Sequence, residues 1–213
     1  MENGREHMMK MGKNYEISIN IPKLKIVEND YRKDFISNIS EIDDFFEKVT
    51  TKYPNVILDI FETKLEKNDD RLPLLDDEYF RLCEEQKYLK FIEEVFEINS
   101  NKCYVNIPFY DTNINYILQT LNNLDLIDKY IFLNQELNFK NKNNQYFLID
   151  NINLLRTFLK AMIREVIKID LYFDKKPLLL FSNFDLSLPL VFKTTKDMSM
   201  YKKVSNNHGL YFR

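Results

Sequence analysis

The stretch that decides the fold is IDLYFDKKPLLLFSNFDLSLPLVF, residues 169–192. Apolar and polar side chains alternate over 169–173, which is the period of a strand with one buried face. The sequence Asp-Lys-Lys-Pro at 174–177 has turn chemistry, and apolar runs follow at 178–181 and 186–192. Short apolar runs separated by turns predict β-hairpins at this end of the chain.

The sequence before this stretch predicts helices and further strands. Helices are expected where apolar residues at helical spacing follow a capping residue or an acidic first turn, over 40–53, 76–97, 112–124 and 151–167. Their expected caps include Ser40, Asp111 or Thr112, and Asn151. Strands are expected at 15–21, 56–61, 103–107, 130–133, 146–149 and 210–212.

This order of elements predicts the fold class and the domain plan. We expect an α+β (mixed α/β) fold in which about four helices pack on a mixed or largely antiparallel sheet. Pro189 suggests that its strand lies at the sheet edge. We expect residues 14–213 to form a single globular domain, and residues 1–13 to be a disordered or non-native tail. The tail is methionine-rich, and either a mistaken start codon or a cloning remnant explains it.

Composition limits the environment and the class of partner. Hydrophobic residues make up 45% of the chain, with 13 Tyr and 17 Phe, but no apolar run reaches the ~20 residues of a membrane span. The net charge is only −3, so no global field favours nucleic acid. Lys202 and Lys203 beside Tyr201 are a weak nucleic-acid pattern. We expect a soluble, cytoplasmic protein with no membrane contact, with nucleic acid not favoured as a partner.

The helix at 76–97 and the cysteines give testable burial predictions. Cys83 and Cys103 lie in helical and strand patterns and are expected to be buried thiols without a disulfide. The buried side of the helix is expected to comprise Leu75, Tyr79, Leu82, Leu89, Ile92 and Phe96.

Glycine and histidine are the most restrictive residues. No glycine lies between Lys13 and His208, which argues against the usual phosphate loops, dinucleotide turns, nucleophile elbows and EF-hand loops. Left-handed turn positions are therefore expected at Asn, Asp or a strained residue. His208 is the one histidine of the expected domain and is interpreted as part of a turn. We expect no cofactor, and a protein that is not an enzyme.

Charge is unevenly distributed. Residues 59–97 contain thirteen acids and six bases, whereas residues 98–213 contain fifteen bases and ten acids. A local acidic surface attracts a basic partner, although acids in a first helical turn are also favoured by the helix dipole alone. The predicted partner-binding residues are Asp69, Asp70, Asp76, Asp77, Glu78, Glu84 and Glu85.

These observations favour a non-enzymatic protein-binding domain of the immunity or antitoxin type, which presents an acidic surface to a basic protein. One alternative is a metal-dependent hydrolase or nuclease with Asp and Glu ligands, which requires three carboxylates converging in one pocket. Another is a small-ligand sensor, which requires an aromatic cavity with a few inward polar groups. Ser182 and Asp185 are candidate hydrogen-bonding groups for such a ligand, although a simple turn explains them too. The oligomeric state stays open.

Overall fold

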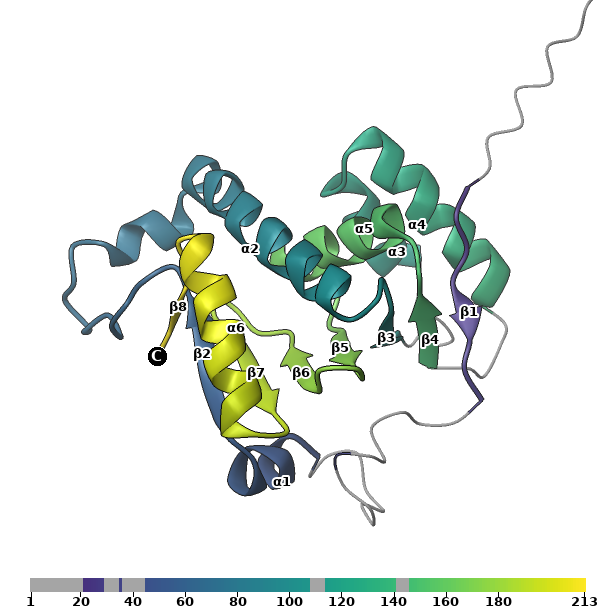
Figure 1. Ribbon diagram of the computed structural model, residues 1–213. Coiled ribbons are helices and arrows are strands. Elements are labelled where there is room, and N and C mark those ends of the chain that lie inside the picture. Colours follow the sequence, from purple (N-terminus) through teal and green to yellow (C-terminus); the bar gives the residue numbers. More distant parts are fainter. Residues whose placement is uncertain (1–20, 29–34, 36–44, 108–113, 141–145) are drawn as a thin grey trace, which may run out of the picture.

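The computed structural model describes residues 21–28, 35, 45–107, 114–140 and 146–213 (Figure 1). The expected tail at 1–13, the expected helix caps at 40, 111 and 112, and almost all of the expected strand at 15–21 lie outside these ranges. Within them, no helix is long and apolar enough to cross a membrane.

The central element is an eight-stranded sheet in the order β1-β4-β3-β5-β6-β7-β2-β8. Every neighbouring pair is antiparallel, which confirms the expected sheet and the C-terminal hairpins. The strands are β1 Lys25–Ile26, β2 Asn55–Asp59, β3 Cys103–Asn106, β4 Tyr146–Ile149, β5 Asp170–Phe173, β6 Leu178–Phe181, β7 Leu188–Phe192 and β8 Tyr211–Phe212.

The described residues form six α-helices, so the fold is α+β as expected, with two more helices than the sequence suggested. The four expected helices are all present, and a short 3₁₀ helix, η2, spans Leu72–Asp76. The α-helices are α1 Phe45–Lys52, α2 Glu78–Ile98, α3 Ile114–Asn122, α4 Leu126–Phe139, α5 Ile152–Ile163 and α6 Thr195–Asn207.

The two faces of the sheet carry different cores. On one face, side chains such as Val105 and Leu180 pack with Phe158 of α5 and Tyr201 of α6 in the main apolar cluster. On the other face, a smaller cluster joins α1 to the sheet. Strand alternation separates the two sets, because neighbouring residues of one strand point to opposite faces.

The strand expected at 130–133 is wrong, because these residues belong to α4. The run Tyr-Ile-Phe-Leu has strand-like composition, but the buried residues of α4 repeat at helical spacing. Half of those buried residues are polar, which hides the helical period from a hydrophobicity pattern. The buried residues are Asp128, Ile131, Phe132, Gln135, Glu136 and Phe139.

Helix α6 has no counterpart in the sequence predictions. Thr194 caps its start by accepting a hydrogen bond from the Asp197 backbone, and few of its side chains are apolar. Tyr201 lies at the centre of its buried side and is fully buried, so this ring is not available to stack on a nucleic-acid base. The methionines Met198 and Met200 pack partly against the core.

The prediction that Pro189 marks a sheet edge is also wrong. Strand β7 lies between β6 and β2, with Pro189 opposite Ile57. Phe192 donates its N–H to the Pro54 carbonyl, so by alternation the Pro189 nitrogen faces β6. The pairing of β6 with β7 reaches only Leu190, so no ladder hydrogen bond is lost at the proline.

The burial predicted for side chains in the first turns of helix α2 is not found. Tyr79 and Leu82 are 78% and 42% exposed, and Cys83 is exposed, whereas Cys103 is buried and both thiols are free. The expected Leu89, Ile92 and Phe96 are buried. The buried side chains of the helix begin only at Glu85. The apolar stripe extends further toward the N-terminus, into turns that have no core to pack against.

Left-handed backbone positions follow the helix ends more than the residue types. Asn101 and Asp185 have positive φ as expected, but so do Ser100, Glu165 and Leu186. Ser100 and Glu165 each follow the C-cap of a helix, where the chain reverses direction. The described left-handed positions outside glycine therefore fall on Asn and Asp at two sites and on strained residues of other types at three.

Candidate functional site

A hollow of about 410 Å³ lies beside the exposed first turns of α2. Its walls come from the start of α2, the end of α5, the link between α3 and α4, and Leu186 after β6. The lining residues are Asp76, Glu78, Arg81, Leu82, Glu85, Asn122, Asn123, Leu124, Asp125, Ile163, Arg164 and Leu186.

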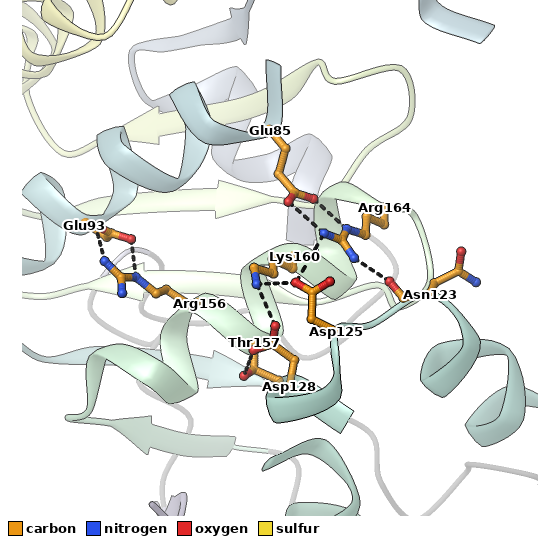
Figure 2. A network of polar contacts seen from close by, with 9 residues as sticks. All are labelled: Glu85, Glu93, Asn123, Asp125, Asp128, Arg156, Thr157, Lys160 and Arg164. Atoms are coloured by element: carbon orange, nitrogen blue, oxygen red, sulfur yellow. Dashed lines mark hydrogen bonds and ion pairs between the residues drawn. The ribbon is translucent and has the colours of Figure 1, made fainter. Parts of the chain in front are cut away.

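A buried ion pair joins two of these walls, as Figure 2 shows. The Arg164 guanidinium donates two parallel hydrogen bonds to Glu85, from Nε to Oε2 at 2.7 Å and from Nη2 to Oε1 at 2.9 Å. Glu85 is only 2% exposed. The hydrogen bond to Glu85 is the main reason why the pKa of Arg164 is raised above its usual value, so the guanidinium stays charged.

The same guanidinium holds the link between α3 and α4. Its Nη1 donates to the Asn123 carbonyl at 2.6 Å, and its Nη2 lies 3.9 Å from Asp125 (Figure 2). Lys160 of α5 donates to Asp125 at 2.8 Å and to Asp128 at 2.6 Å. The Lys160 hydrogen bond lowers the pKa of Asp125, so this carboxylate remains ionised at neutral pH.

Strained backbone lies at the opposite wall. Glu165, at φ 60°, pairs with Arg81 at 2.5 Å and accepts a hydrogen bond from the Asp185 N–H at 3.0 Å. Asp185 and Leu186 are themselves left-handed, at φ 57° and 53°. Two contacts of Glu165 therefore lie beside three left-handed residues next to the hollow, and unfavourable backbone conformations often accompany functional sites.

The charges around the hollow leave a negative excess. Among the described residues around the hollow, the cations Arg81, Lys160 and Arg164 already pair with carboxylates. Asp76 and Glu78 are exposed, and neither forms an ion pair with any residue in the described ranges. The chemical complement of this hollow is therefore a cation.

Exposed apolar side chains lie close to Asp76 and Glu78 along the chain. Leu82 lines the hollow one turn after Glu78, and Tyr79 and Leu74 lie nearby in sequence and are also exposed. Exposed apolar groups next to acids are typical of protein-binding surfaces, which bury a ring or aliphatic chain and exclude water from the charges around it.

The seven predicted acids have different environments. Asp69 pairs with Arg71, and the Arg71 hydrogen bond lowers the Asp69 pKa to about 2, whereas Glu84 pairs with Lys87 at 2.5 Å. Asp77 caps α2 by accepting the Phe80 N–H at 2.7 Å. Asp70, like Asp76 and Glu78, is exposed, and Glu85 is buried against Arg164.

The hollow brings together only three predicted residues, Asp76, Glu78 and Glu85. Sequence reasoning missed Arg81, Asp125 and Arg164, which complete its walls. The spacing of these residues along the chain does not predict that they lie close together, because the packing of α2 against α5 brings them together. His208, interpreted as a turn residue, is the C-cap residue of α6 and hydrogen-bonds Glu94 at 2.7 Å.

In the part of the chain that the structure describes, no group of three His, Cys, Asp or Glu side chains is arranged to hold a metal ion. The hydrolase alternative therefore gains no support from these residues. No protein-family model, curated protein or solved structure matches this chain.

Proposed function

We propose that this chain is a non-enzymatic protein-binding domain that captures a basic partner at the hollow beside α2, in the manner of immunity and antitoxin proteins. The observation that carries the proposal is the pair of carboxylates Asp76 and Glu78, exposed and without ion pairs among the described residues. A lysine or arginine of the partner inserts between them, while Tyr79 and Leu82 contact the apolar surface around it.

The walls of the hollow support a preformed site. The Glu85–Arg164 and Arg81–Glu165 pairs fix its sides before a partner arrives, so little ordering cost opposes binding. The excess negative charge also accelerates the encounter with a basic protein. The exposed free thiol of Cys83 is compatible with a reducing compartment, so we expect this capture in the cytoplasm.

The test is affinity purification from the native host with the intact chain and two charge-reversed variants. The double variant Asp76→Lys with Glu78→Lys reverses the charge at these two positions of the hollow and leaves the helix cap Asp77 unchanged. Glu47→Lys with Glu97→Lys makes the same change in net charge at exposed positions on α1 and at the far end of α2.

We expect a stoichiometric basic protein with the intact chain and with the control variant, and at least a tenfold loss of its affinity with the hollow variant. The association rate of the purified pair falls as salt is added, because the attraction is electrostatic. Equal capture by both variants contradicts the proposal, as does an acidic partner.

A further inference from the structure

Helix α4 has an apolar side that faces solvent. Four large side chains on this side are between 61% and 81% exposed: Leu126, Ile127, Tyr130 and Leu137. Leu133 lies on the same side of the helix and is half-buried. A contiguous row of exposed apolar groups marks an interaction surface, whereas single exposed apolar residues do not.

Polar contacts on the buried side fix this orientation of the helix. Asp128 accepts hydrogen bonds from Thr157 and Lys160 of α5, both at 2.6 Å. The Gln135 side chain accepts a hydrogen bond from the Leu24 N–H at 3.0 Å. These contacts hold the polar side of α4 against the rest of the molecule. The apolar side therefore stays on the outside of the folded chain.

The exposed row has the spacing of a coiled-coil seam. Leu126, Tyr130, Leu133 and Leu137 follow one another at intervals of four, three and four residues, as the d and a positions of successive heptads do. We call these four residues the α4 seam. In two identical antiparallel helices, Leu126 faces Leu137 of the other copy and Tyr130 faces Leu133, because both pairs share one midpoint along the helix. Every layer of such a pair is apolar.

The two ends of α4 carry opposite charges. Asp125 precedes the helix, with a side chain that is 62% exposed, and the exposed Lys140 follows its last residue. An antiparallel pair of α4 helices brings each Asp125 near Lys140 of the other copy and also opposes the two helix dipoles. A parallel pair brings like charges together. The charges therefore favour the same antiparallel arrangement as the apolar layers.

We propose that α4 is the contact surface of a homodimer, in which the α4 seam packs antiparallel against the α4 seam of a second copy around a two-fold axis. Leu137 of the second copy lies opposite Leu126 and enters a hollow of about 490 Å³ beside the first turn of α4. Leu126, Ile127 and Ile131 line this hollow from α4, so the entering side chain meets apolar surface.

The size of the contact predicts a weak dimer. An exposed apolar side chain of this kind offers roughly 100 Å² for burial. The four most exposed side chains of two copies then bury on the order of 800 Å², and the surrounding polar surface brings the total near the ~1,000 Å² of a small specific interface. We expect a dissociation constant of about 10–100 μM, because the helices are already folded and little ordering cost opposes their association.

The test of association is sedimentation velocity of the full chain over about 5 to 500 μM. We expect the intact chain to change from monomer to dimer over this range. Leu137→Glu, at an exposed position, places charge in two symmetric layers and weakens association at least tenfold, with an unchanged circular dichroism spectrum. Phe184→Glu is the matched control, since it makes the same change at an exposed ring outside α4, and it leaves association unchanged.

Disulfide trapping tests the register. In a Cys83→Ser background, the variants Leu126→Cys and Leu137→Cys are oxidised separately and as an equal mixture. We expect a disulfide-linked dimer from the mixture alone. The antiparallel seam places position 126 beside position 137 of the other copy, and it separates each position from its own equivalent by about 16 Å along the helix axis.

Three results overturn the proposal. The first is a chain that stays monomeric at about 500 μM, including one whose α4 binds a different protein. The second is equal association of the intact chain and Leu137→Glu. The third is efficient linking of position 126 to position 126 of the other copy, which indicates a parallel contact. Because the α4 seam does not line the α2 hollow, these results leave the partner-capture proposal unaffected.

Discussion

Arg164 of α5 clamps Glu85 of α2 through two parallel hydrogen bonds of 2.7 and 2.9 Å, and the carboxylate is almost completely buried. The pair joins the two helices that form the walls of the α2 hollow. Removing two charges from water has a cost that offsets most of their attraction, so the pair specifies how α2 and α5 meet more than it adds stability.

Breaking the pair from one side should therefore be much worse than replacing both partners. We expect Glu85→Gln or Arg164→Met to lower the free energy of unfolding by about 3 kcal/mol, because each leaves one buried group without its partner. The double variant Glu85→Leu with Arg164→Met should recover most of this loss. Urea denaturation followed by circular dichroism measures all three.

The surface pair between Arg156 and Glu93 is the matched control. It has the same two-point geometry, with distances of 2.5 and 2.9 Å, but the Arg156 side chain is 46% exposed. Arg156→Met should cost less than about 1 kcal/mol. Equal losses for Arg156→Met and Arg164→Met would show that burial does not set the energetics of the Glu85 pair.

Local patterns were sufficient for most of the fold. The alternation at 169–173, the runs at 178–181 and 186–192 and the four periodic helices predicted the antiparallel sheet and its covering helices, and the structure has them. The failures at α4 and α6 share one cause. Both helices bury polar side chains, such as Gln135 and Ser205, so a pattern of apolar residues does not mark their buried sides.

The candidate site was less predictable. The sequence indicated acidic residues, but it did not reveal that Glu85 faces inward while Asp76 and Glu78 face outward. Which of these acids faces inward depends on the point along α2 at which the helix extends beyond the core. Arg164 lies 79 residues from Glu85 along the chain, and no local rule connects the two.

The pKa of Asp125 gives a pH prediction. Its pKa lies below the usual 3.8, mainly because Lys160 donates a hydrogen bond to the charged form. A lowered pKa in the folded state adds stability that is fully present above pH 3.8 and is lost as the pH falls through the folded-state value.

Asp125→Asn should therefore be slightly less stable than the intact chain at pH 6, and the difference should be smaller at pH 2.5. Because the Asp125 side chain is 62% exposed, the difference at pH 6 should be under about 1 kcal/mol and should shrink in 0.5 M salt. Urea titrations at the two pH values measure it. A difference that grows on acidification would contradict the sign of the pKa shift.

Tyr88 should stabilise the strained loop at the α2 hollow. Its hydroxyl donates to the Leu186 carbonyl, and Tyr88 is fully buried. Burial raises the pKa of Tyr88 well above its usual 10.0, so the hydroxyl remains a donor at every pH at which the fold is studied.

We expect Tyr88→Phe to cost about 1–2 kcal/mol, because the buried carbonyl loses its donor. Amide hydrogen exchange should accelerate at residues 185–187 more than in the sheet. Tyr130→Phe, at a position that is 61% exposed, is the control and should change neither stability nor exchange. A loss of stability without local acceleration would place the effect of the hydroxyl elsewhere.

The C-terminal ends of α2 and α6 allow a test of how the scarcity of glycine affects the free energy of unfolding. Helices α2 and α6 end in the same hydrogen-bond pattern: Asn101 N–H to Phe96 carbonyl in α2, and Leu210 N–H to Ser205 carbonyl in α6. The left-handed residue is Gly209 at φ 68° in α6, but Ser100 at φ 63° in α2.

Opposite substitutions at these two positions should have opposite effects. Ser100→Gly relieves the left-handed strain and should raise the free energy of unfolding by about 0.5–1 kcal/mol, even with the loss of the Lys175 hydrogen bond at 2.9 Å. Gly209→Ala should lower it by about 1 kcal/mol. The added Cβ lies 3.7 Å from Lys87, so dihedral strain and not a clash causes the loss. Thermal and urea unfolding of both variants measure the pair, and two changes of the same sign would contradict the shared motif.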